Sequence, residues 1–173
     1  LLHAKFDAES DVARRFRLEA RAAAAIGHPG IVDVLDLGVT DAGEPFIVME
    51  RLDGETLGAK LARGGALSAR EAVDLVCEVL LALAAAHDKH IVHRDLKPEN
   101  LFLCERPERR VKILDFGISK FATDDLSLTR TGTVMGTPLY MSPEQARDAK
   151  GIGPASDLYS IGAILYEALS GRP

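Results

Sequence analysis

The sequence has few cysteines and no long apolar run. Only Cys77 and Cys104 occur among 173 residues, and they lack the short paired spacing of a zinc site. Two isolated thiols favour a reducing compartment over a disulfide. Cys77 falls within an apolar pattern of helical period, which predicts a buried thiol. The longest apolar stretch, residues 79–86, is too short to cross a bilayer, and the first residues do not resemble a signal peptide.

No block of like charge runs along the chain. The 21 Lys and Arg against 26 Asp and Glu leave a net charge of -5, which disfavours a nucleic-acid partner. With 47% hydrophobic residues, 15 Gly and 8 Pro, the composition excludes a collagenous or largely disordered chain. The length suits one domain, or one and a part, with room for a real core. Because the chain starts at Leu1 and stops at Pro173, we expect a piece of something longer.

Local patterns predict the first half of the chain. Residues 10–25 predict an amphipathic helix that ends before 27–30. Residues 31–39 and 44–52 predict two antiparallel strands joined at 40–43. A short helical run then leads to Gly64 and Gly65. The spacing of Ser68 and Glu71 predicts a capping box, which opens a long helix with an apolar stripe made of Val73, Val76, Cys77, Leu80, Ala84 and His87.

The second half predicts short strands and one further helix. Apolar pieces at 91–92, 100–103 and 111–114 alternate with polar turns and indicate small strands. Residues 119–137 predict a long functional loop, since they are polar and lack periodicity. The near-continuous apolar character of 157–169 predicts a helix that is buried on most sides.

Two short motifs carry the chemistry. Residues 93–100 read HRDLKPEN, and residues 115–117 read DFG. Transfer of a γ-phosphoryl group needs an oriented nucleophile, divalent cations and positive charge for the transition state. Carboxylate, ammonium and amide groups can supply all three. Each motif or residue taken alone also has a purely structural interpretation. DFG alone can be a turn at the end of a strand, Glu19 a solvated charge and Met49 a core residue. The combination in order makes chance resemblance remote.

At these residues the sequence resembles the protein kinase family. Residues 93–100 look like the catalytic loop, 115–117 like the metal-binding loop, and 136–146 like the end of the activation segment. Ser142 stands where the family usually has the Ala of A-P-E. The resemblance continues to Asp157, which is similar to the family's buried Asp that braces the catalytic loop. His93 looks like a structural residue.

The resemblance implies a fold and its division. We expect an α+β, two-lobed protein kinase fold that is partial, with the small lobe missing its first strands and the large lobe its last helices. Residues 1–52 would form part of the N-terminal lobe, with a hinge at about 50–52. Residues 53–173 would form part of the C-terminal lobe, with the activation segment at 115–144. Missing helices would leave Glu144 unpaired and the apolar flank of 157–169 exposed.

The resemblance also implies roles. Asp95 would act as the base, Lys97 as the cation on the phosphoryl group and Thr137 as a residue that holds both. Asn100 and Asp115 would bind Mg²⁺. On the nucleotide side, Met49 would be the gatekeeper, and Glu50 and Leu52 would be hinge residues. Glu55 would contact the ribose, and Phe102 would be a further cofactor-binding residue. Glu19 would pair with an anchoring Lys that the chain lacks.

The implied function is that of a bacterial, Hanks-type serine/threonine protein kinase. It would use ATP and Mg²⁺, act on Ser and Thr of protein substrates, and lie in the cytoplasm, with any membrane anchor outside this segment. Arg94 would bind a phosphate on Thr129, Thr131 or Thr133. Two alternatives stay open: a catalytically silent scaffold or binding module, and a non-functional truncated product. We expect weak or no turnover from the 173-residue chain alone.

Overall fold

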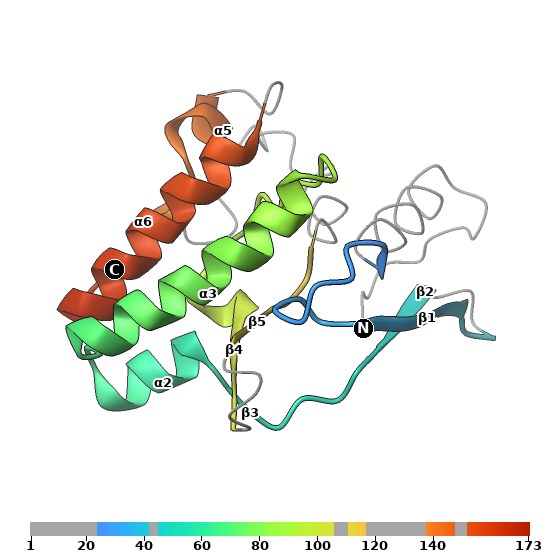
Figure 1. Ribbon diagram of the computed structural model, residues 1–173, viewed down its shortest axis with the longest axis horizontal. Coiled ribbons are helices and arrows are strands. Elements are labelled where there is room, and N and C mark those ends of the chain that lie inside the picture. Colours follow the sequence, from blue (N-terminus) through green and yellow to red (C-terminus); the bar gives the residue numbers. More distant parts are fainter. Residues whose placement is uncertain (1–23, 42–44, 106–110, 117–137, 148–151) are drawn as a thin grey trace.

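The computed structural model describes residues 24–41, 45–105, 111–116, 138–147 and 152–173. Its strands form two separate sheets. The first pairs β1 (Val34–Val39) with β2 (Pro45–Met49), and the second contains β3 (Gly54–Thr56), β4 (Leu101–Cys104) and β5 (Val111–Ile113) in the order β3-β4-β5. All strand pairs within the sheets are antiparallel. Figure 1 shows β1 and β2 running away from the second sheet and the helices.

The predicted hairpin is confirmed, with shorter strands than expected. Val34 pairs with Met49 and Val39 with Pro45. The segment before β1 does not extend this sheet, because it pairs with β5 instead. Ile31 forms a parallel bridge with Ile113, and the Val32 N–H donates to the Ile113 carbonyl at 3.0 Å. The first sheet is therefore tied to the second one just ahead of β1.

The second sheet contains one strand that the sequence patterns do not predict. β4 and β5 lie close to the expected positions, but no strand forms at 91–92. β3 spans Gly54–Thr56, a stretch in which the sequence patterns predict no strand. A Cβ at Gly54 would lie 2.0 Å from the Leu103 carbonyl oxygen, and φ is +145° there, so glycine allows this close pairing. A strand of three residues is too short to show a period.

The long helix α3 (Ala69–His87) begins as predicted. The Ser68 hydroxyl accepts the Glu71 N–H, and the Glu71 carboxylate accepts the Ser68 N–H, which completes the capping box. Hydrogen bonds from the hydroxyl and backbone of Ser68, followed by the charge of Lys60, hold the pKa of Glu71 below its ordinary value. The shorter α2 (Leu57–Gly64) ends at Gly65, where φ is +71°.

The predicted buried stripe of α3 is wrong. The residues that face the core are Ala72, Leu75, Val76, Val79, Ala82, Leu83 and Ala86. Of the expected stripe, Val76 is buried, whereas Val73 is 52% exposed and Cys77 is also exposed. The expected burial of the Cys77 thiol is therefore wrong too. Residues 79–86 are apolar on all sides, so periodicity alone could not select the face that the neighbouring elements cover.

The last helix, α6 (Pro154–Ser170), is present, but its expected burial on most sides is wrong. Gly171, with φ of +69°, donates its N–H to the Glu167 carbonyl and ends the helix. Ile161 and Ile164 lie in the core, whereas Leu158 and Tyr166 are 51% and 63% exposed. The exposed apolar flank that the family resemblance implied is confirmed.

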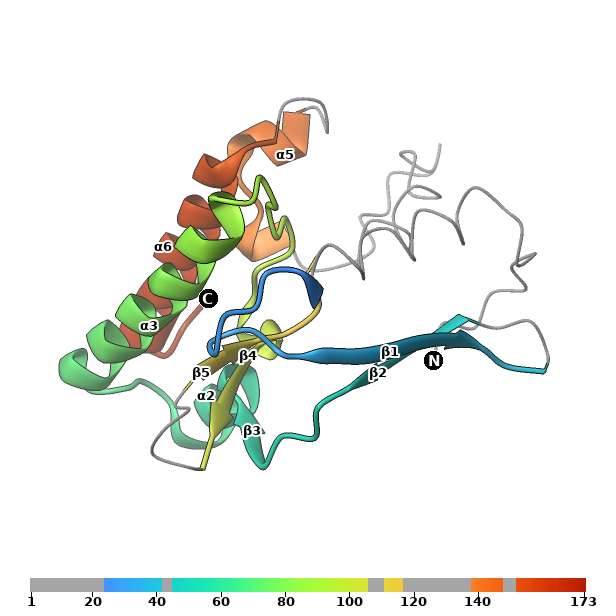
Figure 2. The same cartoon turned by 45° about the vertical axis from the view of Figure 1, so that its right-hand side comes forward.

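The core lies between α3, α6, α2 and the second sheet. Its buried members include Leu57 from α2, Leu83 from α3, Ile113 from β5 and Ile164 from α6. Figures 1 and 2 both show α3 and α6 side by side, and Figure 1 shows α2 below the lower end of α3. No helix among the described residues is long and apolar enough to cross a bilayer.

Two predicted segments lie mostly or wholly outside the described residues. Residue 24 is helical and the chain turns at 25–26, where the expected first helix ends. The remainder of that helix and the long loop at 119–137 are outside the described ranges.

Candidate active site

A buried carboxylate holds the backbone of the 93–100 loop. Asp157, in the first turn of α6, is fully buried. One of its oxygens accepts the His93 N–H at 2.9 Å and lies 2.8 Å from Nε2 of His87, while the other accepts the Arg94 N–H at 2.8 Å. The bracing role that the resemblance implied for Asp157 is confirmed.

His93 is a buried structural residue, as expected. Its Nε2 lies 2.8 Å from the Leu114 carbonyl oxygen, and its Nδ1 lies 3.3 Å from the Asp95 amide nitrogen. A neutral ring that is protonated at Nε2 satisfies both partners. The ring also packs edge-on against Phe116 at a centroid distance of 4.7 Å. Burial lowers the pKa of His93, which favours this neutral form.

Two residues of the site hold left-handed backbone angles. φ is +70° at Arg94 and +55° at Asp115. Such angles are unusual outside glycine and persist where the surroundings determine them. Arg94 is held on both sides, because its N–H donates to Asp157 and its carbonyl accepts Nε2 of Gln145 at 2.7 Å.

Three of the predicted catalytic residues meet on the loop. Nζ of Lys97 lies 3.2 Å from Oδ2 of Asp95, and both side chains are 39% exposed. Nδ2 of Asn100 donates to the Asp95 carbonyl at 2.8 Å. The 3-10 helix η1 (Pro98–Asn100) follows, and the buried Leu96 anchors the loop in the core. An exposed carboxylate thus lies beside a cation, on a backbone held by buried groups.

Asp115 is brought to this loop through the second sheet. The Leu114 N–H donates to the Asn100 carbonyl at 2.9 Å, which places the end of β5 against η1. Asn100 directly precedes β4, and Asp115 follows β5 by two residues. Because β4 and β5 are antiparallel, both proposed metal ligands lie at the same end of these two strands. Gly117, which follows Phe116, is outside the described residues.

The described residues among the predicted nucleotide contacts lie on β2, β3, β4 and the segment that joins the two sheets. Met49 ends β2 and is 38% exposed, and Leu52 is half-buried before β3. Phe102 is half-buried in β4, the central strand. The side chain of Glu50 turns toward Lys112 of β5, with which it forms an ion pair.

Glu55 is engaged elsewhere. Its two carboxylate oxygens accept hydrogen bonds from the two terminal nitrogens of Arg63, at 2.7 and 2.8 Å. This bidentate pair between β3 and α2 raises the pKa of Arg63. A contact between Glu55 and a ribose would require that the Arg63 pair be broken or shared.

The Ser-Pro-Glu motif forms a small buried network. Ser142 and Gln145 cap the short helix α5 (Pro143–Arg147) reciprocally, since the Ser142 hydroxyl accepts the Gln145 N–H and the Gln145 side chain accepts the Ser142 N–H. The resemblance implies that Glu144 lacks its arginine partner, and among the described residues its partner is a serine hydroxyl instead of a cation. Glu144 is exposed, and Ser156 Oγ donates to it at 2.8 Å, which lowers the pKa of Glu144.

A second contact joins the 3-10 helix η2 (Pro138–Tyr140) to α6. The Tyr140 hydroxyl donates to the Glu167 carboxylate, and the Ser160 hydroxyl donates to the Tyr140 carbonyl at 2.7 Å. Burial, followed by the hydrogen bond to Glu167, raises the pKa of Tyr140 above its ordinary value. The end of the expected activation segment is therefore fixed on the same helix that carries Asp157.

Several predicted residues cannot be placed. Glu19, Thr137 and the three candidate phosphorylation sites Thr129, Thr131 and Thr133 lie outside the described residues. Their roles remain predictions.

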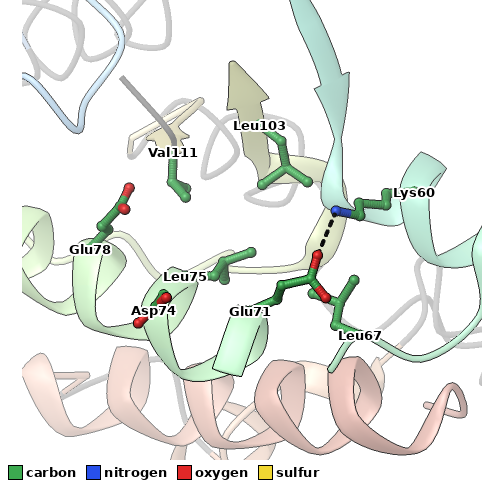
Figure 3. A pocket seen from close by; sticks show the side chains of 8 residues that line it. All are labelled: Lys60, Leu67, Glu71, Asp74, Leu75, Glu78, Leu103 and Val111. Atoms are coloured by element: carbon green, nitrogen blue, oxygen red, sulfur yellow. Dashed lines mark ion pairs between the residues drawn. The ribbon is translucent and has the colours of Figure 1, made fainter. Parts of the chain in front are cut away.

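The cavity in Figure 3 is distinct from the loop. It measures about 220 Å³ and lies between α2, α3 and the second sheet. Carboxylates of α3 line one side, where Glu71 forms an ion pair with Lys60 at 3.8 Å. Leu75 and Val111 provide apolar walls. None of the nucleotide or catalytic residues that the structure describes lines this cavity.

Two residues that hold the site together are assigned no role from the sequence, although Gln145 lies within the 136–146 motif. Gln145 supports the Arg94 backbone, and Lys112 joins the second sheet to Glu50. The importance of Lys112 could have been predicted from the sequence. A lysine between Val111 and Ile113 in a buried strand needs an anionic partner. Gln145 carries no such signal.

The fold and the loop together define the class of this protein. The protein kinase domain family matches residues 3–173, so the chain belongs to the protein kinase family. Its architecture is similar to the solved kinase domain of Mycobacterium tuberculosis PknI, with a TM-score of 0.73 and 28% identity; 96% of this chain and 59% of that chain are covered. The predicted kinase fold is confirmed.

Curated relatives place the chain in the bacterial, Hanks-type serine/threonine branch. It is 45% identical to the serine/threonine-protein kinase PknA of Mycobacterium tuberculosis, over 99% of this chain and 40% of the relative. It is 46% identical to pkn3 of Myxococcus xanthus, over 99% of this chain and 32% of the relative. The chain thus spans well under half the length of these relatives. Protein kinases generally use ATP and Mg²⁺.

Proposed function

We propose that this chain carries the catalytic loop of a protein kinase that transfers the γ-phosphoryl group of ATP to Ser or Thr hydroxyls of protein substrates. The observation that carries the proposal is the joint placement of Asp95, Lys97 and Asn100 on a loop whose backbone is held by buried Asp157. Catalysis of phosphoryl transfer depends on positioning and charge, and such a held loop supplies both.

Each loop residue has a proposed task. The Asp95 carboxylate orients the substrate hydroxyl and accepts its proton, as the oxygen forms a bond to the γ-phosphorus and the bond from that phosphorus to the ADP oxygen breaks. The Lys97 ammonium, which lies 3.2 Å from Asp95, stabilises negative charge on the transferred group. Thr137 is proposed to hold these two residues. The Asp95 side chain is 39% exposed, which leaves its carboxylate accessible to a substrate hydroxyl.

The residues present fit a magnesium ion that is shared with phosphate. Mg²⁺ prefers hard oxygen ligands, and it is usually bound by one or two side chains together with substrate phosphates. The described residues include no cluster of three or more acidic, His or Cys side chains that could hold a metal alone. Asn100 and Asp115 would hold the ion, which would neutralise charge on the ATP phosphates.

The adenine side is proposed at the junction of the two sheets. Met49, Leu52 and Phe102 offer apolar surface there, and the backbone at Glu50 and Leu52 offers polar groups to the base. We propose that Glu55 meets the ribose only when Arg63 is displaced, and that Glu19 pairs with a lysine from outside this chain. The lobes would divide at 52–53. Since ATP is the substrate, we place the domain on the cytoplasmic side.

Phosphotransfer on a generic basic protein tests the proposal. The 173-residue chain and a version extended by the residues encoded on both sides would be incubated with Mg²⁺ and radiolabelled ATP. We expect transfer to Ser and Thr by the extended protein, and little or none by the 173 residues alone.

The matched variant is Asp95→Asn in the extended protein. Because Asp95 is exposed and its main-chain contacts do not need the carboxylate, the variant should keep its unfolding midpoint and lose at least about 10²-fold in rate. Turnover at the parent rate in the variant, or a folded extended protein without any transfer, would contradict the assignment. The second result would favour a silent scaffold.

A further inference from the structure

A lysine is buried at the junction between the two sheets. Lys112 is 1% exposed in β5, where Val111 and Ile113 on either side are also buried. Its ammonium forms an ion pair with Glu50, whose side chain is 15% exposed, and donates to the Ile31 carbonyl at 3.2 Å. A charge in this position would be costly without such partners.

The ion pair joins three segments of the chain. Oε1 of Glu50 accepts the Asp33 N–H at 2.9 Å, and the Glu50 N–H donates to the Asp33 carbonyl at 3.0 Å. The Ile113 N–H donates to the Gly30 carbonyl at 2.8 Å. Residues 30–33 therefore lie between β5 and the end of β2, and Lys112 reaches across them. Figure 2 shows the segment before β1 beside β5, while β1 and β2 extend away from it.

Two of these segments lead directly to residues that are proposed to bind the nucleotide. Glu50 follows Met49 at the end of β2, on the adenine side. Lys112 precedes Leu114, whose N–H binds the Asn100 carbonyl, and Asp115, on the phosphate side. The separation between the two sides therefore depends on how β2 and β5 are joined. Apolar contacts tolerate small slips, whereas a buried ion pair with fixed acceptors favours one arrangement.

We propose that Lys112 and Glu50 act as a pair of positioning residues that set the separation between the adenine and phosphate sides of the nucleotide cleft. The inference rests on the proposed function and names a determinant of ATP affinity within it. Lys112 acts through the sheets, without contact to the phosphates. The backbone of the catalytic loop at His93 and Arg94 has its own supports in Asp157 and Gln145.

A double substitution separates positioning from stability. Lys112→Met leaves the Glu50 carboxylate without its cation, so it should lower the melting temperature. Lys112→Met with Glu50→Met removes both charges and should recover most of that loss. Lys60→Met is the matched control, since Lys60 is partly exposed and makes a longer ion pair with Glu71.

The kinetic readout is the KM for ATP in the extended protein. We expect the double variant to raise it about 3- to 30-fold, the range of typical coupling effects, while the KM for the protein substrate stays near the parent value. Recovered stability with an unchanged or lower KM for ATP would overturn the inference. Lack of transfer by the extended parent protein would instead refute the proposed function.

A second readout needs no activity. In the nucleotide-free protein, the double variant should exchange the amide hydrogens at positions 32 and 50 faster, because their acceptors lie across the loosened junction. The amides of α3 should keep their protection. Lys112→Gln, which keeps a donor but removes the charge, should shift exchange and KM in the same direction by less. Parent-like exchange at positions 32 and 50 in both variants would overturn the inference.

Discussion

At the scale of single residues, the site is built on buried polar groups whose partners are all provided by the fold. His93 is neutral because burial opposes the imidazolium, and both ring nitrogens have partners in that state. Protonation would place a second N–H at Nδ1, where the ring now accepts from the Asp95 amide. A charged His93 would therefore disturb the backbone of the catalytic loop at Asp95.

This environment predicts a pH dependence of stability. The folded-state pKa of His93 is lowered from the ordinary 6.5, so its contribution to stability is present above pH 6.5 and is lost as the pH falls toward the folded-state pKa. One such group changes the unfolding free energy by at most about 1.4 kcal/mol per pH unit. Urea unfolding between pH 5 and 8 measures it. His93→Gln, which does not titrate, should show a shallower slope over this range, and equal slopes would contradict the assignment.

At the scale of elements, local signals fix where helices begin. Ser68 and Glu71 form their reciprocal hydrogen bonds within a single turn, so the start of α3 does not depend on distant residues. Ser142 and Gln145 do the same for the much shorter α5. In contrast, the buried face of α3 is chosen by α2, α6 and β5, which is why its predicted stripe was wrong.

The cap predicts a graded loss of stability. Ser68→Ala removes the acceptor for the Glu71 N–H and should cost about 1 kcal/mol of unfolding free energy. Ser68→Thr retains a hydroxyl acceptor and should lose less than half of that amount. Urea denaturation at neutral pH compares the two, and equal losses would show that the hydroxyl does not cap the helix.

At the scale of the whole molecule, α3 and α6 each bury one side and expose large apolar side chains on the other. Leu81 is 65% and Tyr166 is 63% exposed, and further exposed apolar residues lie on the same two helices: Val73, Leu80, Leu158, Tyr159 and Leu169. Such surfaces favour self-association of a soluble chain.

We therefore expect the 173-residue chain to associate in a concentration-dependent manner. Leu81→Lys with Tyr166→Lys should shift it toward the monomer in sedimentation velocity, while the unfolding free energy changes by no more than about 0.5 kcal/mol per site. Ala59→Lys with Ala146→Lys adds the same charge at exposed positions elsewhere and serves as the control. If both pairs reduce association equally, net charge rather than the apolar surfaces controls it.

The sequence by itself determined the family, the hairpin of β1 and β2, the capping box of α3 and the loop that contains Asp95, Lys97 and Asn100. These features depend on residues that are near one another in the chain, so spacing and residue type are sufficient to predict them. The brace from Asp157 also followed from the sequence, although only through the family resemblance, because 64 residues separate it from His93.

Only the tertiary structure decided the remaining features. The pair of Lys112 with Glu50 spans 62 residues, and the diversion of Glu55 to Arg63 depends on how α2 folds back on β3. The exposure of Cys77 depends on which elements reach α3. For Lys112 and Cys77 the outcome depends on which distant elements remove a group from water, and a local pattern contains no information on which partner will be present. The Glu55–Arg63 pair is exposed and only eight residues apart, but it forms only once α2 has folded back on β3.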